Sequence, residues 1–179
     1  MEDLSKWCSE ALGELGQEFG DDDFWSAKVA AVHRPRAHVG VHLAIFVEPF
    51  LGFMLDGTKT IESRFALRRL APYGQVSASD VVFLKAASGP VVGICQVGQV
   101  WNMTVDGLDD LASIRRRFGK AMRAESQDFW DSRRSAAFAT LMKVSEVRTL
   151  RRPMSCPKKD RRGWVVLRES VRTVERIAA

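Results

Sequence analysis

Hydrophobic and polar residues follow two different periods along this chain, and each period predicts a type of element. In the first twenty residues apolar side chains recur every three or four positions, the spacing of one face of a helix. Gly20 stands where this amphipathic helix is expected to end. The face consists of Leu4, Trp7, Cys8, Ala11, Leu12, Leu15 and Phe19.

From residue 41 onward the period shortens to two, which predicts strands. Val41–Val47 is the first, with Val41, Leu43, Ile45 and Val47 on one face. Further strands are expected at residues 59–64, 80–86, 91–101, 141–149 and 163–167, and helices at residues 106–140 and 169–178. Gly93 and Gly98 predict a bulge or tight bend in the fourth strand. Strands interrupted by helices in this order predict a mixed barrel with helices at its openings.

Residues 51–65 contain the highest density of candidate functional side chains in the chain. An apolar helical segment follows Pro49 and is expected to end at Gly57. The next residues start a strand in which alternation places Glu62 and Arg64 on one face and Lys59 on the other. A helix, a glycine stop and this strand are expected to bring the three charges to one mouth of the barrel.

These three side chains suggest a binding site. A carboxylate beside a guanidinium stays ionised, so Glu62 is expected to act as an acceptor or a base. The planar fork of Arg64 suits phosphate or a carboxylate. Together they suit the hydrogen-bonding edge of a nucleobase, with Arg64 or Lys59 on the phosphate. The alternative is an internal Glu62–Arg64 pair that ties the strand to the barrel.

Composition narrows the class of protein. Apolar residues make up 46% of the 179-residue chain, which is ordinary for a globular domain. No apolar run of about 18 residues is present, and the start, Met-Glu-Asp-Leu, lacks the basic end of an export signal. We therefore expect no membrane segment and a cytoplasmic location. The three cysteines form no CxxC pair, so neither a metal site nor any other cofactor is expected.

Charge is distributed unevenly within a net charge of +5. Residues 1–110 carry 9 Lys and Arg against 15 Asp and Glu, whereas residues 111–179 carry 18 against 7. A basic half of this kind suggests a face that follows phosphates. The densest basic loop offers Lys158, Lys159, Arg161 and Arg162 as phosphate contacts. The alternative is that these residues are solvated faces.

Three further residues are candidates for the same binding site. Tyr73, the only tyrosine, and Trp101 are placed to stack on a base, although Trp101 also suits the core. Lys85, at the end of a strand, is a candidate ligand-binding lysine.

Gly57-Thr-Lys-Thr-Ile-Glu-Ser-Arg64 resembles the G-x-K-T-x-E-x-R signature of the ASCH domain family, part of the PUA-like superfamily. The resemblance extends over residues 41–169. It implies an α+β fold: a PUA-like mixed β-barrel with flanking helices and an added N-terminal helix. We expect residues 1–40 to form an N-terminal helical extension packed on the barrel. Residues 41–179 would be the ASCH/PUA-like domain, with a helical insertion at about residues 106–140.

The resemblance also implies two classes of function. Many ASCH domains are regarded as binding RNA or nucleotides, so the favoured partner is RNA, single-stranded nucleic acid, a nucleotide or a modified nucleoside. Some relatives are reported as nucleases. Others hydrolyse the amide of N4-acetylcytidine, using a K-T-x-T motif and a later glutamate. Lys59 matches the lysine, but Glu62 occupies the position of the second threonine, which removes the hydroxyl nucleophile.

Two alternatives to binding therefore remain. In a metal-free hydrolase, Lys59 and Glu62 would be catalytic, Glu62 activating water and Lys59 stabilising an oxyanion. Glu125 is the candidate for the later carboxylate of the family. The other alternative is a protein-interaction module that docks an acidic partner.

Overall fold

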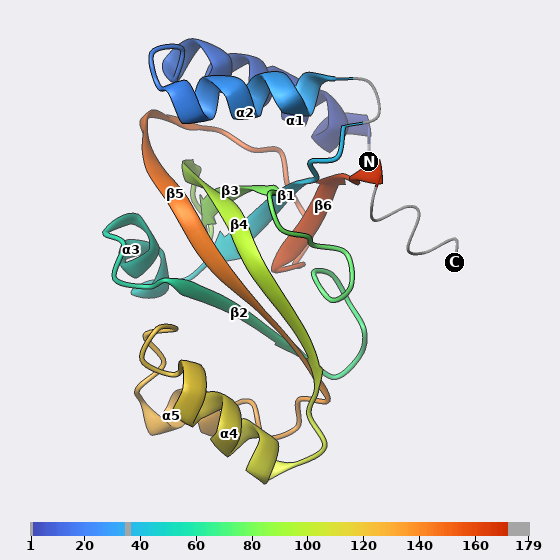
Figure 1. Ribbon diagram of the computed structural model, residues 1–179, viewed down its shortest axis with the longest axis vertical. Helices are drawn as coiled ribbons and strands as arrows, with labels where there is room; N and C mark the ends of the chain where they lie inside the picture. The colour runs from blue at the N-terminus through green and yellow to red at the C-terminus, as the bar shows by residue number, and fades with distance from the viewer. Residues whose placement is uncertain (1, 35–36, 172–179) are drawn as a thin grey trace.

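One curled sheet of six strands organises the protein (Figure 1). The computed structural model describes residues 2–34 and 37–171. The strand order is β2-β5-β4-β3-β1-β6, in which β1 and β3 run parallel and every other neighbouring pair runs antiparallel. The strands are β1 (Val41–Phe46), β2 (Ile61–Ala66), β3 (Val81–Ala86), β4 (Val91–Thr104), β5 (Phe138–Met154) and β6 (Trp164–Arg168). The sheet forms a half-barrel flanked by helices, which confirms the predicted α+β fold class.

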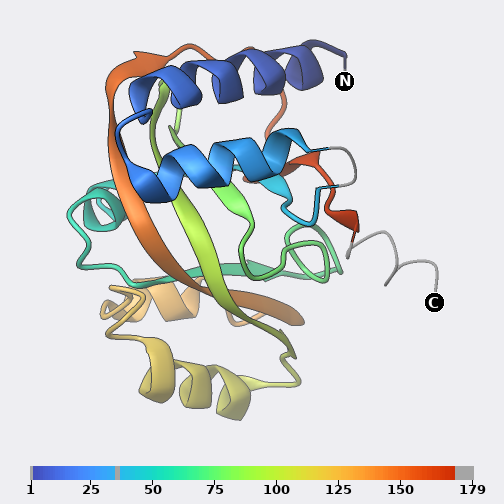
Figure 2. The same ribbon diagram turned by 45° about the horizontal axis from the view of Figure 1, so that its top comes forward.

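Two N-terminal helices cover one end of the half-barrel (Figures 1 and 2). α1 (Glu2–Glu18) is the predicted amphipathic helix. α2 (Asp23–His33) was not predicted from the sequence. Asp22, in the run Asp21–Asp23, caps the start of this helix: its side chain accepts a hydrogen bond from the Trp25 N–H, 3.0 Å away.

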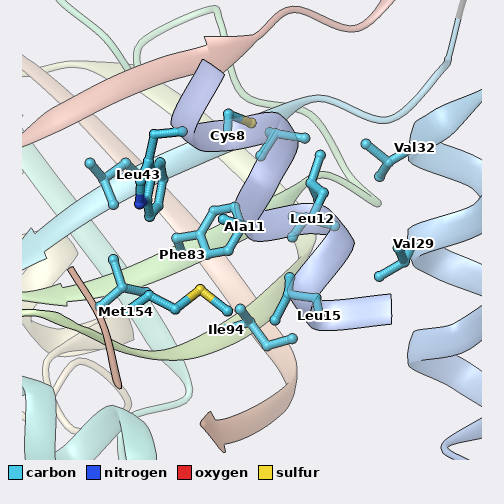
Figure 3. Packing of buried hydrophobic residues seen from close by; sticks show 14 of the residues in the cluster. Cys8, Ala11, Leu12, Leu15, Val29, Val32, Leu43, Phe83, Ile94 and Met154 are labelled. Atoms are coloured by element: carbon cyan, nitrogen blue, oxygen red, sulfur yellow. The ribbon is translucent and has the colours of Figure 1, made fainter. Parts of the chain in front are cut away.

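Side chains of α1 fill the space between α2 and the sheet (Figure 3). Leu12 and Leu15 of α1 belong to one buried cluster with Val32 of α2 and Phe83 and Ile94 of the sheet. Burying a side chain of this size contributes about 1.5–3 kcal/mol. The N-terminal helices therefore share a hydrophobic core with the strands they cover.

The opposite end of the half-barrel carries α4 (Leu108–Phe118) and α5 (Gln127–Asp131) (Figure 1). The helical segment predicted for residues 106–140 is thus too long, and the strand predicted for 141–149 is too short, since β5 begins at Phe138 and ends at Met154. Pairing explains the difference, because Phe138 lies opposite both Thr104 of β4 and Ala66 of β2. Arg151 and Arg152 lie in this strand.

Long strands β4 and β5 bend where glycines allow it. Their register shifts between Val91 and Gly93 and again between Val97 and Val100, which confirms the predicted irregularities at Gly93 and Gly98. A Cβ at Gly93 would lie only 2.9 Å from the Arg148 carbonyl oxygen of the neighbouring strand. Because of these bends, β4 and β5 each contribute to both ends of the half-barrel.

Most of the helix predicted over residues 169–178 lies outside the described residues. Within residues 2–34 and 37–171, no helix has the combined length and apolarity needed to cross a bilayer.

Candidate functional site

A pocket of about 470 Å³ opens where α3 (Phe50–Leu55), β1, β2 and the end of α5 meet. Its polar wall contains four charged side chains: Lys59, Glu62, Arg64 and Arg133. Much of the remaining wall is aromatic. The other lining residues are Ile45, Phe46, Val47, Phe50, Ser63, Phe65, Phe129 and Ser132.

The turn between α3 and β2 places Lys59 in this pocket. Gly57 has a φ of +77°, as expected for a residue that ends a helix. The Lys59 N–H donates to the Phe53 carbonyl at 2.7 Å, which folds the turn back onto α3. The strand begins at Ile61 and not at Lys59 as predicted, so strict alternation does not govern Lys59. Its side chain therefore reaches the face of Glu62, and its predicted placement on the opposite face is wrong.

Lys59 and Glu62 form a buried ion pair. Their residues are 3% and 4% exposed, and Lys59 Nζ lies 3.3 Å from Glu62 Oε2. The ammonium also donates to the Met122 carbonyl at 2.9 Å. Burial lowers the pKa of Lys59 more than the negative charge of Glu62 raises it. The lysine charge is thus held in the pocket at a desolvation cost.

Arg64 connects the two edges of the half-barrel. Its Nη1 donates to the Gly163 carbonyl (2.9 Å), next to edge strand β6, and its Nη2 donates to the Ile45 carbonyl of β1 (3.1 Å). Because β2 and β6 are the edge strands, this arginine spans the gap that no backbone ladder closes. We call this gap, with its Arg64 bridge, the seam.

Arg64 also carries positive charge into the pocket. Its Nε lies 2.7 Å from Glu62 Oε1, an ion pair in which the N–H is not aligned for a hydrogen bond. The guanidinium lies 5.0 Å from the ring centroid of Phe46 and 5.4 Å from that of Trp164. Arg64 therefore combines the structural role considered above with a place in the candidate site.

Arg133 is the pocket residue that the sequence analysis missed. Its guanidinium carbon lies 3.5 Å from the ring centroid of Phe129, and Nη1 donates to the Phe129 carbonyl at 2.7 Å. Burial lowers the pKa of Arg133, against the opposing effect of Glu62. The spacing of four residues between Phe129 and Arg133 is the signal that the sequence contained.

The charges of the pocket do not balance. Lys59, Arg64 and Arg133 face a single carboxylate, that of Glu62, which leaves an excess of two positive charges. Fixed, partly desolvated positive charge of this kind attracts an anion more strongly than the same charge in open water.

A buried polar network supports the wall of the seam. The Trp164 indole N–H donates to His42 Nδ1 at 3.2 Å, so His42 Nε2 carries the proton that it shares with Asp80 Oδ2 at 3.0 Å. The Asp80 carboxylate also accepts the Gly40 N–H (2.6 Å) and the Ser77 N–H (2.8 Å). His42 and Asp80 are fully buried. This network fixes the orientation of Trp164, against which Arg64 packs.

Tyr73 and Lys85 lie outside this pocket. Tyr73 lines a second, smaller pocket of about 220 Å³, whose wall includes Arg64. Lys85 is buried at the β3–β4 turn, where its ammonium donates to the carbonyls of Ala86 and Gly89. Trp101 packs against Phe118, with ring centroids 5.1 Å apart, and Glu125 is exposed away from the pocket lining.

The predicted basic loop contains its own counter-ion. Asp160 lies 3.0 Å from Lys158 Nζ and 2.7 Å from Arg162 Nη2, and the hydrogen bonds from Arg162 hold the pKa of this carboxyl well below its usual range. Lys159 and Arg161 are exposed and have no ion-pair partner among the described residues. These two are the charges of the loop that remain free for phosphate.

Metal ligands and reactive thiols do not gather in the part of the chain that the structure describes. No group of three or more His, Cys, Asp or Glu side chains there is arranged to hold a metal ion. Burial raises the pKa of the Cys8 thiol to about 11 and also raises that of Cys95. Neither thiol is therefore activated as a nucleophile.

Comparison with known proteins identifies the fold. No protein-family model and no curated protein matches the sequence. The solved structure of ASCH from Zymomonas mobilis aligns with a TM-score of 0.57 at 15% identity, covering 77% of this chain and 93% of that chain. A variant of that protein aligns with a TM-score of 0.58 at 15% identity, covering 81% and 97%. The likeness confirms an ASCH-like fold.

Proposed function

We propose that this protein binds RNA or a nucleotide in the pocket around Glu62. The observation that carries the proposal is the excess of two positive charges, Lys59, Arg64 and Arg133 against Glu62, in a wall rich in aromatic rings. A nucleotide combines the two features that this wall suits, a flat base and an anionic phosphate. The pocket volume of about 470 Å³ lies within the range of about 300–1,000 Å³ usual for small-ligand sites.

The polar groups have capacity for a ligand. A carboxylate has about four lone-pair directions, so Glu62 retains acceptor capacity beside its two cations. An ammonium has three N–H donors. Lys59 has two partners for them, the Met122 carbonyl and the Glu62 carboxylate, so part of its donor capacity remains for a ligand. Arg133 offers the planar fork that binds phosphate with two parallel hydrogen bonds. In this assignment Glu62 and Lys59 contact the base edge, and Arg133 contacts the phosphate.

The ASCH-like fold supports the same proposal. The resemblance of residues 57–64 to the ASCH signature implies binding of RNA or nucleotides, and the aligned ASCH structures share the fold that carries the signature. The free charges of Lys159 and Arg161 would add phosphate contacts outside the pocket and contribute affinity without sequence preference.

The test compares two adjacent arginines. Arg133→Gln removes a pocket charge, whereas Arg134→Gln removes a charge that is 61% exposed and paired with Asp131 at 2.8 Å. Because a hydrogen bond to a charged group contributes about 1.5–3 kcal/mol, Arg133→Gln should weaken nucleotide or RNA binding roughly ten- to a hundredfold. Arg134→Gln should bind as wild type. Equal affinities for wild type and Arg133→Gln in calorimetric titrations would overturn the proposed phosphate contact.

Hydrolysis is the second candidate function, and the buried pair of Lys59 and Glu62 is the observation that favours it. A buried, perturbed lysine beside a carboxylate at 3.3 Å is a typical feature of catalytic sites. In this alternative Glu62 activates water and Lys59 stabilises the oxyanion of an acylated nucleoside, or the same pair acts on RNA. Two cations beside Glu62 weaken it as a base, so binding remains the first proposal.

Product analysis separates the two functions. Wild type is incubated with N4-acetylcytidine, other acylated nucleosides and short RNAs, and products are followed by mass spectrometry. Product formation that Lys59→Met and Glu62→Gln both abolish would establish an enzyme. Bound ligand recovered without product would establish a binding protein.

A further inference from the structure

The second pocket shares a wall with the first. Arg64 and Phe65 line both pockets, so the two cavities adjoin each other at these residues. The second cavity measures about 220 Å³, below the range of about 300–1,000 Å³ usual for a complete small-ligand site. Its size and position suit an added portion of a ligand that already occupies the first pocket.

The chemistry of the second pocket is that of a stacking site. Tyr73 and Phe138 form an edge-to-face pair with ring centroids 5.2 Å apart, and both line the cavity together with Trp164. The Arg69 guanidinium lies 5.9 Å from the Tyr73 ring centroid and 5.4 Å from that of Phe138. No carboxylate is among the residues that line this cavity. Aromatic rings beside two arginines suit a base and its phosphate.

Hydrogen bonds hold the Tyr73 loop in place without a ligand. The Gly74 N–H donates to Asn102 Oδ1 at 3.1 Å, and the Thr140 hydroxyl donates to the same oxygen at 3.1 Å. The Tyr73 N–H donates to the Leu70 carbonyl at 2.9 Å. Because the loop is anchored to Asn102 of β4, which the Thr140 hydroxyl of β5 holds in turn, little ordering of the loop opposes binding at the Tyr73 ring.

Resting on the proposed function, we infer that the ligand is an RNA strand of at least two nucleotides. One base occupies the pocket around Glu62, and the next stacks against Tyr73 in the second pocket. Arg64 lies between them, and Arg69 at the rim contacts the backbone phosphate. Tyr73 therefore distinguishes an oligonucleotide from a free nucleotide.

The test separates the contribution of the second base to binding affinity from that of the second phosphate. Isothermal titration calorimetry compares uridine 5′-monophosphate, uridine 3′,5′-bisphosphate (pUp) and the dinucleotide pUpU, and repeats the series for the other three bases. Stacking of one base should make pUpU bind wild type about five- to a hundredfold more tightly than pUp. Tyr73→Ala should abolish this gain and leave the affinity for the monophosphate unchanged.

Two further variants control for folding. Tyr73→Phe keeps the ring and should keep the gain, whereas Leu67→Ala changes an exposed side chain of the same loop that lines neither pocket and should change nothing. If wild type binds monophosphate and pUp but gains nothing from the second base, the second site is wrong and the proposed function stands. The second site is also wrong if Tyr73→Ala leaves the gain intact or weakens all three ligands equally. Failure of wild type to bind any of the three overturns the proposed function and this inference together.

Discussion

Glu62→Gln should destabilise the folded protein strongly at neutral pH and much less in alkali. The substitution keeps the shape of the side chain and removes the only negative charge of the pocket. Lys59, 3% exposed, and Arg64, with a side chain 21% exposed, then lose their common anion. Removing one partner of a buried ion pair costs about 3–5 kcal/mol. We expect about 3 kcal/mol here, the lower end of that range, since Arg64 keeps two carbonyl partners and some exposure.

The dependence on pH follows from the lowered pKa of Lys59. Its folded pKa lies below the unfolded value, so the unfolded chain binds more protons and stability rises with pH between the two values. Glu62 is the largest influence that raises the folded pKa, and its loss should lower that pKa further. The variant therefore loses the lysine proton at a lower pH than wild type. Its stability deficit should shrink as the pH passes from the folded pKa of the variant up to that of wild type.

The assay is urea unfolding followed by tryptophan fluorescence at pH 7, 8.5 and 10, for wild type and variant in parallel. Glu125→Gln serves as the control, since Glu125 is exposed and lies outside the pocket lining. The double variant Lys59→Met/Glu62→Gln should recover part of the deficit because it removes the stranded ammonium. A deficit below about 1 kcal/mol at pH 7, the usual size for an exposed ion pair, would refute the reasoning. So would a deficit that stays constant up to pH 10.

Three further changes probe the wall of the seam and the basic loop. His42→Phe leaves the buried indole N–H of Trp164 without its acceptor and removes one of the two hydrogen bonds to Asp80 Oδ2, and should cost about 3 kcal/mol in urea unfolding; an unchanged midpoint would contradict the network. Gly163→Ala places a Cβ 3.1 Å from Arg64 Nη1, and about 1 kcal/mol of overpacking should lower the melting temperature by about 2–4 °C; a higher melting temperature would show that the seam has spare room. The pair Lys159→Gln and Arg161→Gln should reduce the slope of log affinity for single-stranded RNA against log salt by about 1.4, whereas an unchanged slope would exclude both phosphate contacts.

Local patterns predicted the parts of the fold that short-range physics determines. The face of α1, the stop at Gly57 and the irregularities at Gly93 and Gly98 depend on neighbouring residues and on the backbone freedom of glycine, and all were predicted from sequence. The clustering of Lys59 with Glu62 and Arg64 was also expected, from the succession of a helix, a glycine stop and a strand.

Pairing over long distances determined the parts that sequence did not predict. Phe138 was expected in a helix because it continues an apolar periodicity, but its backbone pairs with two strands that the pattern could not bring beside it. Arg133 was missed for the same reason, since α5 packs next to β2 only in the folded sheet. Lys59 was assigned to the wrong face because the start of β2 is set by hydrogen bonds from Thr60 and Ile61 to the Ala121 carbonyl, far along the chain.

The seam also has a consequence for the order in which the chain acquires its site during synthesis. All four charged residues of the pocket lie before residue 134, but Gly163, the acceptor that holds Arg64 beside β6, comes about thirty residues later. A nascent chain that ends before Gly163 therefore has every charge of the pocket and lacks one of the two carbonyls that fix the Arg64 guanidinium. Arg64 is held by both carbonyls, those of Ile45 and Gly163, only after β6 has been synthesised and has paired with β1.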